Sequence, residues 1–136
     1  MRVEGNQFFT DNRAIRLVGV SHSGTESACT EGRGEIFQGP SGDTLVLPML
    51  GWKVNTVRVP LNESCWLGID GLAPMSSGLA YQEAIARFVR MLRSHDLFVV
   101  LDLHWNAPGR GVARSQLPMA DADHSAAFWT SVAETF

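Results

Sequence analysis

Three polar side chains, Arg58, Asp102 and His104, lie within two apolar stretches of the chain, where groups that need hydrogen-bond partners are costly to bury. Arg58 belongs to "VNTVRVPL", and Asp102 and His104 close the run "LFVVLDLHW". Side chains alternate between the two faces of a strand, so Asp102 and His104 are expected on one face and Leu101 and Leu103 on the other. A guanidinium, a carboxylate and an imidazole on neighbouring strands can supply each other's hydrogen bonds. The pattern leaves a structural ion pair and a catalytic site open for Arg58 and Asp102, and it favours a functional role for His104.

Hydrophobic patterning predicts a hairpin followed by three strand–helix units. The hairpin is predicted over 2–16, strands over 15–21, 54–61 and 97–103, and helices over 43–52, 79–93 and from 121 or 123 to 136. Asp43 or Thr44 would cap the first helix, which Pro48 would kink or delay, and Asp96 would end the second in a left-handed conformation. The last helix would be capped by Asp121 or Asp123. Its buried face would hold Phe128, Trp129, Val132 and Phe136.

Strands that alternate with helices are typical of a parallel sheet covered by helices. Two architectures fit this order, an open doubly wound sheet and the opening part of a (β/α)₈ barrel. The segment "GVSHSG" lacks the G-x-G-x-x-G spacing of a dinucleotide-binding turn. Polar residues gather instead at the carboxyl ends of the strands, where a barrel carries its active site. The sequence therefore favours the barrel.

Composition excludes several classes of protein. The 136 residues are 45% hydrophobic with a net charge of −3, which is ordinary for a globular domain and argues against a nucleic-acid partner. No segment reaches the roughly 20 apolar residues that a membrane span requires. Residues 1–5 contain no apolar signal region, so the chain lacks a secretion signal or is given without it. The four histidines show no metal-ligand spacing, and we expect no metal site.

Cys29 and Cys65 are too few for a disulfide scaffold, but they can form one bridge. They follow the first and second predicted strands, so their loops share one rim, and we expect a disulfide between them. Trp66 and Trp105 follow strand ends and would serve either as sugar-stacking platforms or as rim packing.

The segments "RLVGVSHSGTE", "WKVNTVRVPLNESCWLG" and "LDLHWNAPG", in this order, resemble the first three βα units of family 5 glycoside hydrolases, a group that contains many cellulases. The resemblance covers nearly the whole chain. It implies that residues 1–136 are part of one (β/α)₈ catalytic domain that cuts β-glycosidic bonds with retention. It further implies a β-glucan substrate such as cellulose, no metal or cofactor, and a secreted enzyme.

By this resemblance Arg58 would orient and charge-stabilise the nucleophilic carboxylate, and His104 would hydrogen-bond the sugar in the −1 subsite. Further residues would line the cleft and bind substrate, namely Glu26, Asn62, Glu63, Trp66 and, as a stacking platform, Trp105.

The chain departs from the family's pattern in one respect. Retaining hydrolysis uses two carboxylates about 5–5.5 Å apart, which the family carries at the ends of strands four and seven, and no Asn-Glu-Pro occurs here. Because a barrel needs roughly 250 residues, we expect the first half of such an enzyme, inactive alone and prone to self-association through open strand edges. Two alternatives stay open: a non-catalytic carbohydrate-binding or assembly fragment, and an unrelated α/β enzyme that uses His104 and Asp102 as a base pair.

Overall fold

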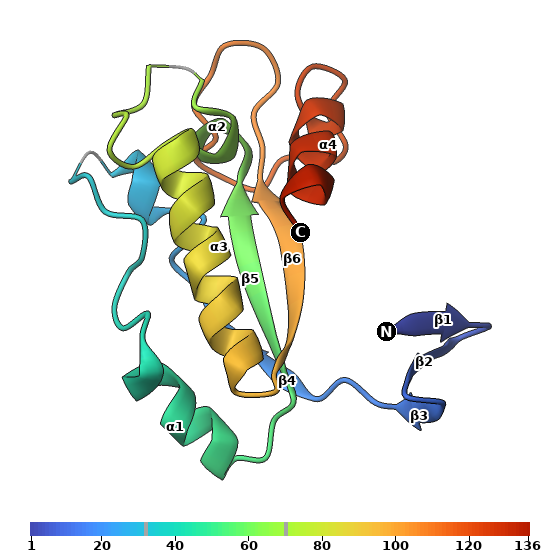
Figure 1. The fold of residues 1–136 in the computed structure, drawn as a ribbon. Coiled ribbons are helices and arrows are strands. Elements are labelled where there is room, and N and C mark those ends of the chain that lie inside the picture. Colours follow the sequence, from blue (N-terminus) through green and yellow to red (C-terminus); the bar gives the residue numbers. More distant parts are fainter. Residues whose placement is uncertain (32, 70) are drawn as a thin grey trace.

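The computed structural model describes residues 1–31, 33–69 and 71–136, and it contains two separate three-stranded sheets (Figure 1). The first is an antiparallel meander of β1 (Arg2–Glu4), β2 (Gln7–Thr10) and β3 (Arg13–Ile15). The second is a parallel sheet of β4 (Gly19–Ser21), β5 (Thr56–Asn62) and β6 (Phe98–Trp105), with β5 in the centre. Helices α1 (Asp43–Gly51), α2 (Glu63–Leu67), α3 (Leu79–Ser94) and α4 (Ser125–Thr135) accompany the parallel sheet.

The predicted N-terminal hairpin is wrong in its strand count, because the chain turns twice rather than once. Asp11 and Asn12 both adopt positive φ, at 47° and 62°, as a tight two-residue hairpin turn requires. Gly5, with φ of 59°, begins an earlier turn that divides the expected first strand into β1 and β2. The strand predicted over 15–21 is likewise interrupted, and only Gly19–Ser21 joins the parallel sheet.

The connection between the two sheets is held by Asn55, through both its side chain and its backbone. Its amide nitrogen donates to the Arg16 carbonyl, and its amide oxygen accepts from the Val18 N–H, both at 2.8 Å. The backbone N–H of Asn55 donates to the Val18 carbonyl, also at 2.8 Å. Asn55 therefore ties the connector to the start of β5.

The central strand shows the alternation that its sequence predicts. Val57, Val59 and Leu61 are fully buried in the core, whereas the Arg58 side chain lies on the opposite face. The close approach of β4 to β5 depends on Gly19, since a Cβ there would lie 2.0 Å from the Thr56 carbonyl oxygen.

Helix α3 covers the apolar face of the sheet and lies along β5 and β6 in Figure 1. Its apolar face is buried as the helical spacing predicts, through Tyr81, Ile85, Phe88, Val89 and Leu92. Asp96 ends the turn after α3 with φ of 59°, the left-handed conformation expected from the sequence. Helix α1 contains Pro48 and is preceded by Gly42, so neither Asp43 nor Thr44 is its capping residue.

Two helical features differ from expectation. Helix α2 occupies a segment predicted as loop, with the Asn62 side chain accepting from the Cys65 N–H at 3.1 Å as its N-cap. Helix α4 begins at Ser125 after His124, and neither Asp121 nor Asp123 occupies its N-cap position.

The buried face of α4 contains fewer residues than predicted. Phe128 and Val132 are buried, whereas Trp129 is 43% exposed and Phe136 is exposed as well. None of the helices in the described ranges has the length and apolar character that crossing a membrane requires.

Candidate functional site

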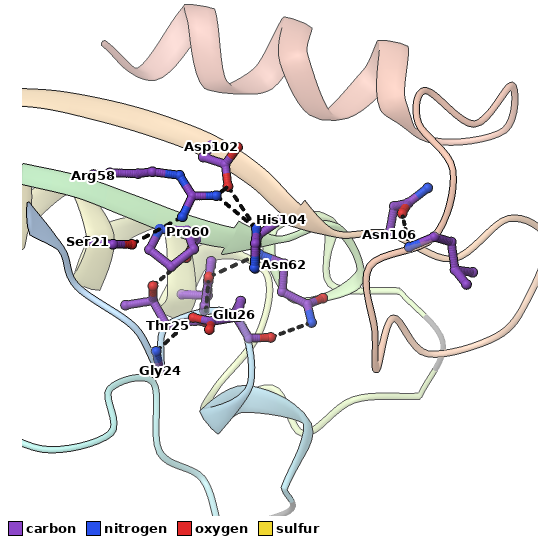
Figure 2. Close-up of polar contacts among 12 residues, drawn as sticks. Ser21, Gly24, Thr25, Glu26, Arg58, Pro60, Asn62, Asp102, His104 and Asn106 are labelled. Atoms are coloured by element: carbon purple, nitrogen blue, oxygen red, sulfur yellow. Dashed lines mark hydrogen bonds and ion pairs between the residues drawn. The ribbon is translucent and has the colours of Figure 1, made fainter.

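The face of the parallel sheet opposite α3 carries a cluster of four polar side chains, one or two from each strand (Figure 2). Ser21 of β4 pairs in register with Arg58 of β5, and Arg58 pairs with Val100 of β6, two residues before Asp102. Because residues two apart on a strand share a face, the register places Asp102 and His104 beside Arg58. The cluster of Ser21, Arg58, Asp102 and His104 is called the polar cluster below.

Hydrogen bonds join all members of the polar cluster. Arg58 Nη2 forms an ion pair with Asp102 Oδ2, and Arg58 Nη1 donates to Ser21 Oγ at 3.1 Å. His104 Nδ1 lies 3.0 Å from the same Asp102 oxygen and 2.9 Å from Arg58 Nη2. The Asp102 carboxylate oxygen thus contacts both the guanidinium and the imidazole and fixes the positions of both.

The polar cluster is half-buried rather than sealed. The side chains of Arg58, Asp102 and His104 are 37%, 29% and 25% exposed. A guanidinium held by its own carboxylate keeps further N–H donors for a second anion, and an imidazole held at Nδ1 keeps Nε2 for a ligand hydroxyl. The arrangement can therefore orient a carboxylate and a neutral, hydroxyl-bearing ligand on one surface.

Cys29 and Cys65, the candidate pair from the sequence, are joined in a disulfide with an S–S distance of 2.08 Å. Cys29 belongs to the 3₁₀ helix η1 (Ala28–Thr30) and Cys65 to α2, and both are buried. The bridge links the loop after β4 to the segment after β5, on the side of the sheet where the strands end.

Asn62 has no polar atom left for a substrate, contrary to its predicted role in a cleft. It is fully buried, and its side-chain nitrogen donates to the carbonyls of Glu26 and Ala113 at 2.7 and 2.8 Å, while its oxygen caps α2. The predicted role of Asn62 is wrong because α2 begins directly after β5 and turns this segment into the core.

The predicted substrate-binding roles of Trp66 and Glu63 are wrong for the same reason. Trp66 is fully buried, packs edge-on against Phe128 and donates from Nε1 to Ser131 Oγ at 3.1 Å. It offers no ring face for sugar stacking. Glu63 is also fully buried, and its carboxyl accepts from the Ala107 N–H at 3.3 Å.

Glu26 and Trp105 remain accessible. The Glu26 carboxylate accepts from the Gly24 N–H at 2.7 Å and is partly exposed. Trp105 ends β6 directly after His104, is partly exposed, and lies opposite Asn62 just past an irregularity in the β5–β6 register. Glu26 and Trp105 therefore remain candidates for lining a site beside the polar cluster, whereas Asn62, Glu63 and Trp66 do not.

Sequence reasoning missed one polar group, the pair formed by Glu63 and Asp121. The Ser125 hydroxyl lies 3.0 Å from Glu63 Oε1 and 3.1 Å from Asp121 Oδ2, so it brings the two carboxyl groups close together, and Asp121 also contacts Asn106. Asp121 precedes Ser125 by four residues, a spacing that signals a local hydrogen bond, but no local spacing connects it to Glu63, which is 58 positions earlier.

Within the described parts of the chain, no group of three or more His, Cys, Asp or Glu side chains could hold a metal ion. Comparison of the chain with models of protein families, with characterised proteins and with solved structures finds no match. The proposal below rests on the residues themselves and on the resemblance of their motifs.

Proposed function

We propose that the chain is the N-terminal part of the (β/α)₈ domain of a retaining glycoside hydrolase that acts on β-glucans such as cellulose. The observation that carries the proposal is the polar cluster on the face of the parallel sheet opposite α3. In a barrel this face lines the interior, and catalytic side chains come from the carboxyl halves of several strands. The order of the motifs and the α/β alternation support the same architecture.

The proposed reaction assigns a distinct task to each member of the polar cluster. Arg58 would use its free N–H groups to orient a nucleophilic carboxylate and to stabilise its charge. Asp102 would hold Arg58 in place, and His104 would hydrogen-bond a hydroxyl of the sugar. The two reacting glutamates would come from strands four and seven, as the resemblance implies. The disulfide supports an oxidising, extracellular setting for such an enzyme.

A second candidate function is carbohydrate binding without hydrolysis. The pairing and burial of the carboxyl groups near the polar cluster favour it. Retaining hydrolysis needs two carboxyl groups about 5–5.5 Å apart on either side of the bond that is cut. Asp102 is committed to Arg58, and Glu63 is fully buried. Glu26 is then the remaining glutamate of the predicted cleft, and a single carboxylate does not make a catalytic pair.

Titration of the isotope-labelled chain with cellohexaose, followed by NMR, tests both candidates. We expect saturable shifts of the Ser21, His104 and Trp105 resonances, which Arg58→Ala or His104→Ala should weaken at least about tenfold, the loss of one or two hydrogen bonds to a charged or polar partner. Arg87→Ala is the matched control, because Arg87 lies exposed on α3, away from the polar cluster. Failure of cellohexaose to bind, or equal binding by all variants, would contradict a carbohydrate site here.

The same samples are assayed for reducing-sugar release from soluble β-glucan. We expect none above background from the chain or from its Glu26→Gln/Glu63→Gln variant. Activity that this double substitution abolishes would show that the 136 residues carry a catalytic pair of their own.

A further inference from the structure

The buried carboxyl group of Glu63 and the partly exposed one of Asp121 connect two parts of the chain that are far apart in the sequence. Glu63 is the first residue of α2, directly after β5, and Asp121 lies four residues before α4. Asp121 belongs to the segment between β6 and α4, residues 106–124, which also reaches Glu63 through the Ala107 N–H, the donor to Glu63 Oε2 at 3.3 Å.

The hydrogen bonds at the pair are distributed unequally. Asp121 Oδ1 accepts from the backbone N–H groups of His124 and Asp123 at 2.7 and 3.0 Å. Asp121 Oδ2 accepts from the Asn106 amide at 3.2 Å. The Ser125 hydroxyl lies 3.1 Å from Asp121 Oδ2 and 3.0 Å from Glu63 Oε1. Asp121 is therefore surrounded by fixed donors, whereas Glu63 has fewer.

This inequality decides which carboxyl group holds the proton. Two charged carboxylates this close to one hydroxyl repel each other, so one of the two groups keeps its proton to a higher pH than an isolated carboxyl group does. The donors around Asp121 favour its charged form. Glu63, removed from water, is the neutral partner, and its O–H donates to the Asp121 carboxylate.

The pKa directions agree with this assignment. Burial, followed by the hydrogen bond to Asp121, raises the pKa of Glu63 from 4.5 to about 7. Burial alone would raise the pKa of Asp121, but hydrogen bonds from the His124 N–H and from the side chains of Glu63, Asn106 and Ser125 hold it well below its ordinary value.

We propose that the Glu63–Asp121 pair is a proton-dependent latch that holds segment 106–124 and the start of α4 against α2. When Glu63 releases its proton to solvent, two adjacent carboxylates remain, and their repulsion frees the segment. Because the segment follows His104 and Trp105 directly, the latch controls the mobility of the chain beside the polar cluster. The latch does not depend on the ligand that the polar cluster binds.

Other titratable groups lie near the latch and must be separated from it. His124 and Asp123 belong to the latched segment, and the His124 Nε2 lies 2.7 Å from the Gly109 carbonyl. On the other side, the buried Tyr81 hydroxyl meets the Asn62 N–H at 3.3 Å, and Glu26 lies beyond it. The charge that acts on Glu63 is that of Asp121. An unperturbed histidine changes its charge between about pH 5 and 8, so His124 requires its own control.

The sign of the pH dependence follows from the two shifts. The raised pKa of Glu63 means that its contribution to stability is complete below pH 4.5 and is lost as the pH rises through about 7. The lowered pKa of Asp121 means that its contribution is present above its ordinary value and is lost as the pH falls below it. The latch is therefore closed in mildly acidic solution and opens above neutrality.

The test uses the full 136-residue chain and two independent readouts. The side-chain carboxyl ¹³C resonance of Glu63 is followed from pH 4 to 9, and amide hydrogen exchange, corrected for intrinsic rates, is measured at Ala107, Ala113 and His124. We expect a Glu63 midpoint near 7 and protection of these amides that falls at least about tenfold above it, as expected for local opening coupled to ionisation. Glu63→Gln is the key variant, since the amide keeps a donor for Asp121 but cannot ionise.

Glu63→Gln should keep the segment protected at every pH, while His124→Gln should leave the wild-type pH dependence unchanged. A Glu63 carboxyl that titrates near its ordinary value would overturn the proposal. So would protection that does not change with pH in the wild type, or a pH dependence that survives in Glu63→Gln and disappears in His124→Gln.

Discussion

At the scale of single residues, two neighbouring aromatic side chains of α4 have opposite environments. Phe128 is fully buried against Trp66, whereas Trp129, the next residue, is 43% exposed. One helical step of about 100° separates them, which carries Trp129 from the core to the edge of the α4 contact. Size and hydrophobicity alone therefore do not identify the residue that anchors α4.

We expect Phe128→Ala to lower the free energy of unfolding by about 3–5 kcal/mol, the cost of removing a fully buried phenyl group. Trp129→Ala should cost below about 2 kcal/mol, since the ring keeps much of its exposure to water and contributes mainly an edge contact to Phe128. Urea unfolding followed by far-UV circular dichroism measures both. Equal losses in the two variants would contradict the assignment of Phe128 as the anchor.

Residue patterns predicted the polar cluster but not the burial of the residues that follow β5. The alternation of side chains correctly placed Arg58 of β5 and His104 of β6 on the opposite face from the apolar side chains that flank them in each strand. It failed just beyond the strand, because a helix of five residues is too short to show periodicity. Asn62 as a capping residue and Gly68, which has φ of 68°, were the available signals for α2.

At the scale of elements, the disulfide is the covalent link between the strand ends. It joins η1 to α2 across 36 positions of the chain, and this span includes α1 and all of β5. A bridge of this span restricts the unfolded chain considerably. The bridge and the buried Asn62, whose side chain bonds to Glu26 and Ala113, hold the same region together by different means.

Reduction of the bridge should lower the free energy of unfolding by about 4 kcal/mol, by loop-closure entropy for a span of this length. Urea titrations of the oxidised chain and of a Cys29→Ser/Cys65→Ser variant give the difference. Thiol titration of the unfolded, unreduced chain should find no reactive thiol. Two thiols per chain would mean that the bridge does not form.

Long, strongly patterned elements were predicted better than short ones. The helical spacing of α3 and the β-branched run of β5 specified their positions to within a few residues, since each buries a continuous face. The meander and the start of α4 depend on short turns, one at Gly5 and Asn6 and one around Asp121. Such turns involve too few residues to produce a periodic pattern in the sequence.

At the scale of the whole molecule, the parallel sheet has two outer strands whose second edges pair with no other strand in the described residues. Val100 on β6 is 40% exposed on the face of the polar cluster, beside that open edge. Closure into a barrel would cover this edge, and it remains a prediction from the motif order and the polar cluster. An exposed parallel edge also offers backbone groups to a second molecule.

We therefore expect the chain to associate as its concentration rises, and Val100→Glu to reduce that association. The new carboxylate lies opposite Arg58 in the register, so it has a partner in the monomer but disfavours an added strand. Sedimentation velocity over a hundredfold range of concentration measures the effect, with Trp129→Ala as a control on another surface. Unchanged association of Val100→Glu would exclude β6 as the interface.

The contacts of Asn55 also affect how readily proteases can cleave the connection between the two sheets. An enzyme that cleaves after arginine must draw several residues around the bond into its own site in an extended form. The carbonyl of Arg16 is held by the Asn55 amide, and the next anchored group, the Val18 N–H, is bound by the same side chain. The bond after Arg16 thus becomes available only when the start of β5 gives way, so the meander and the parallel sheet should resist being cut apart.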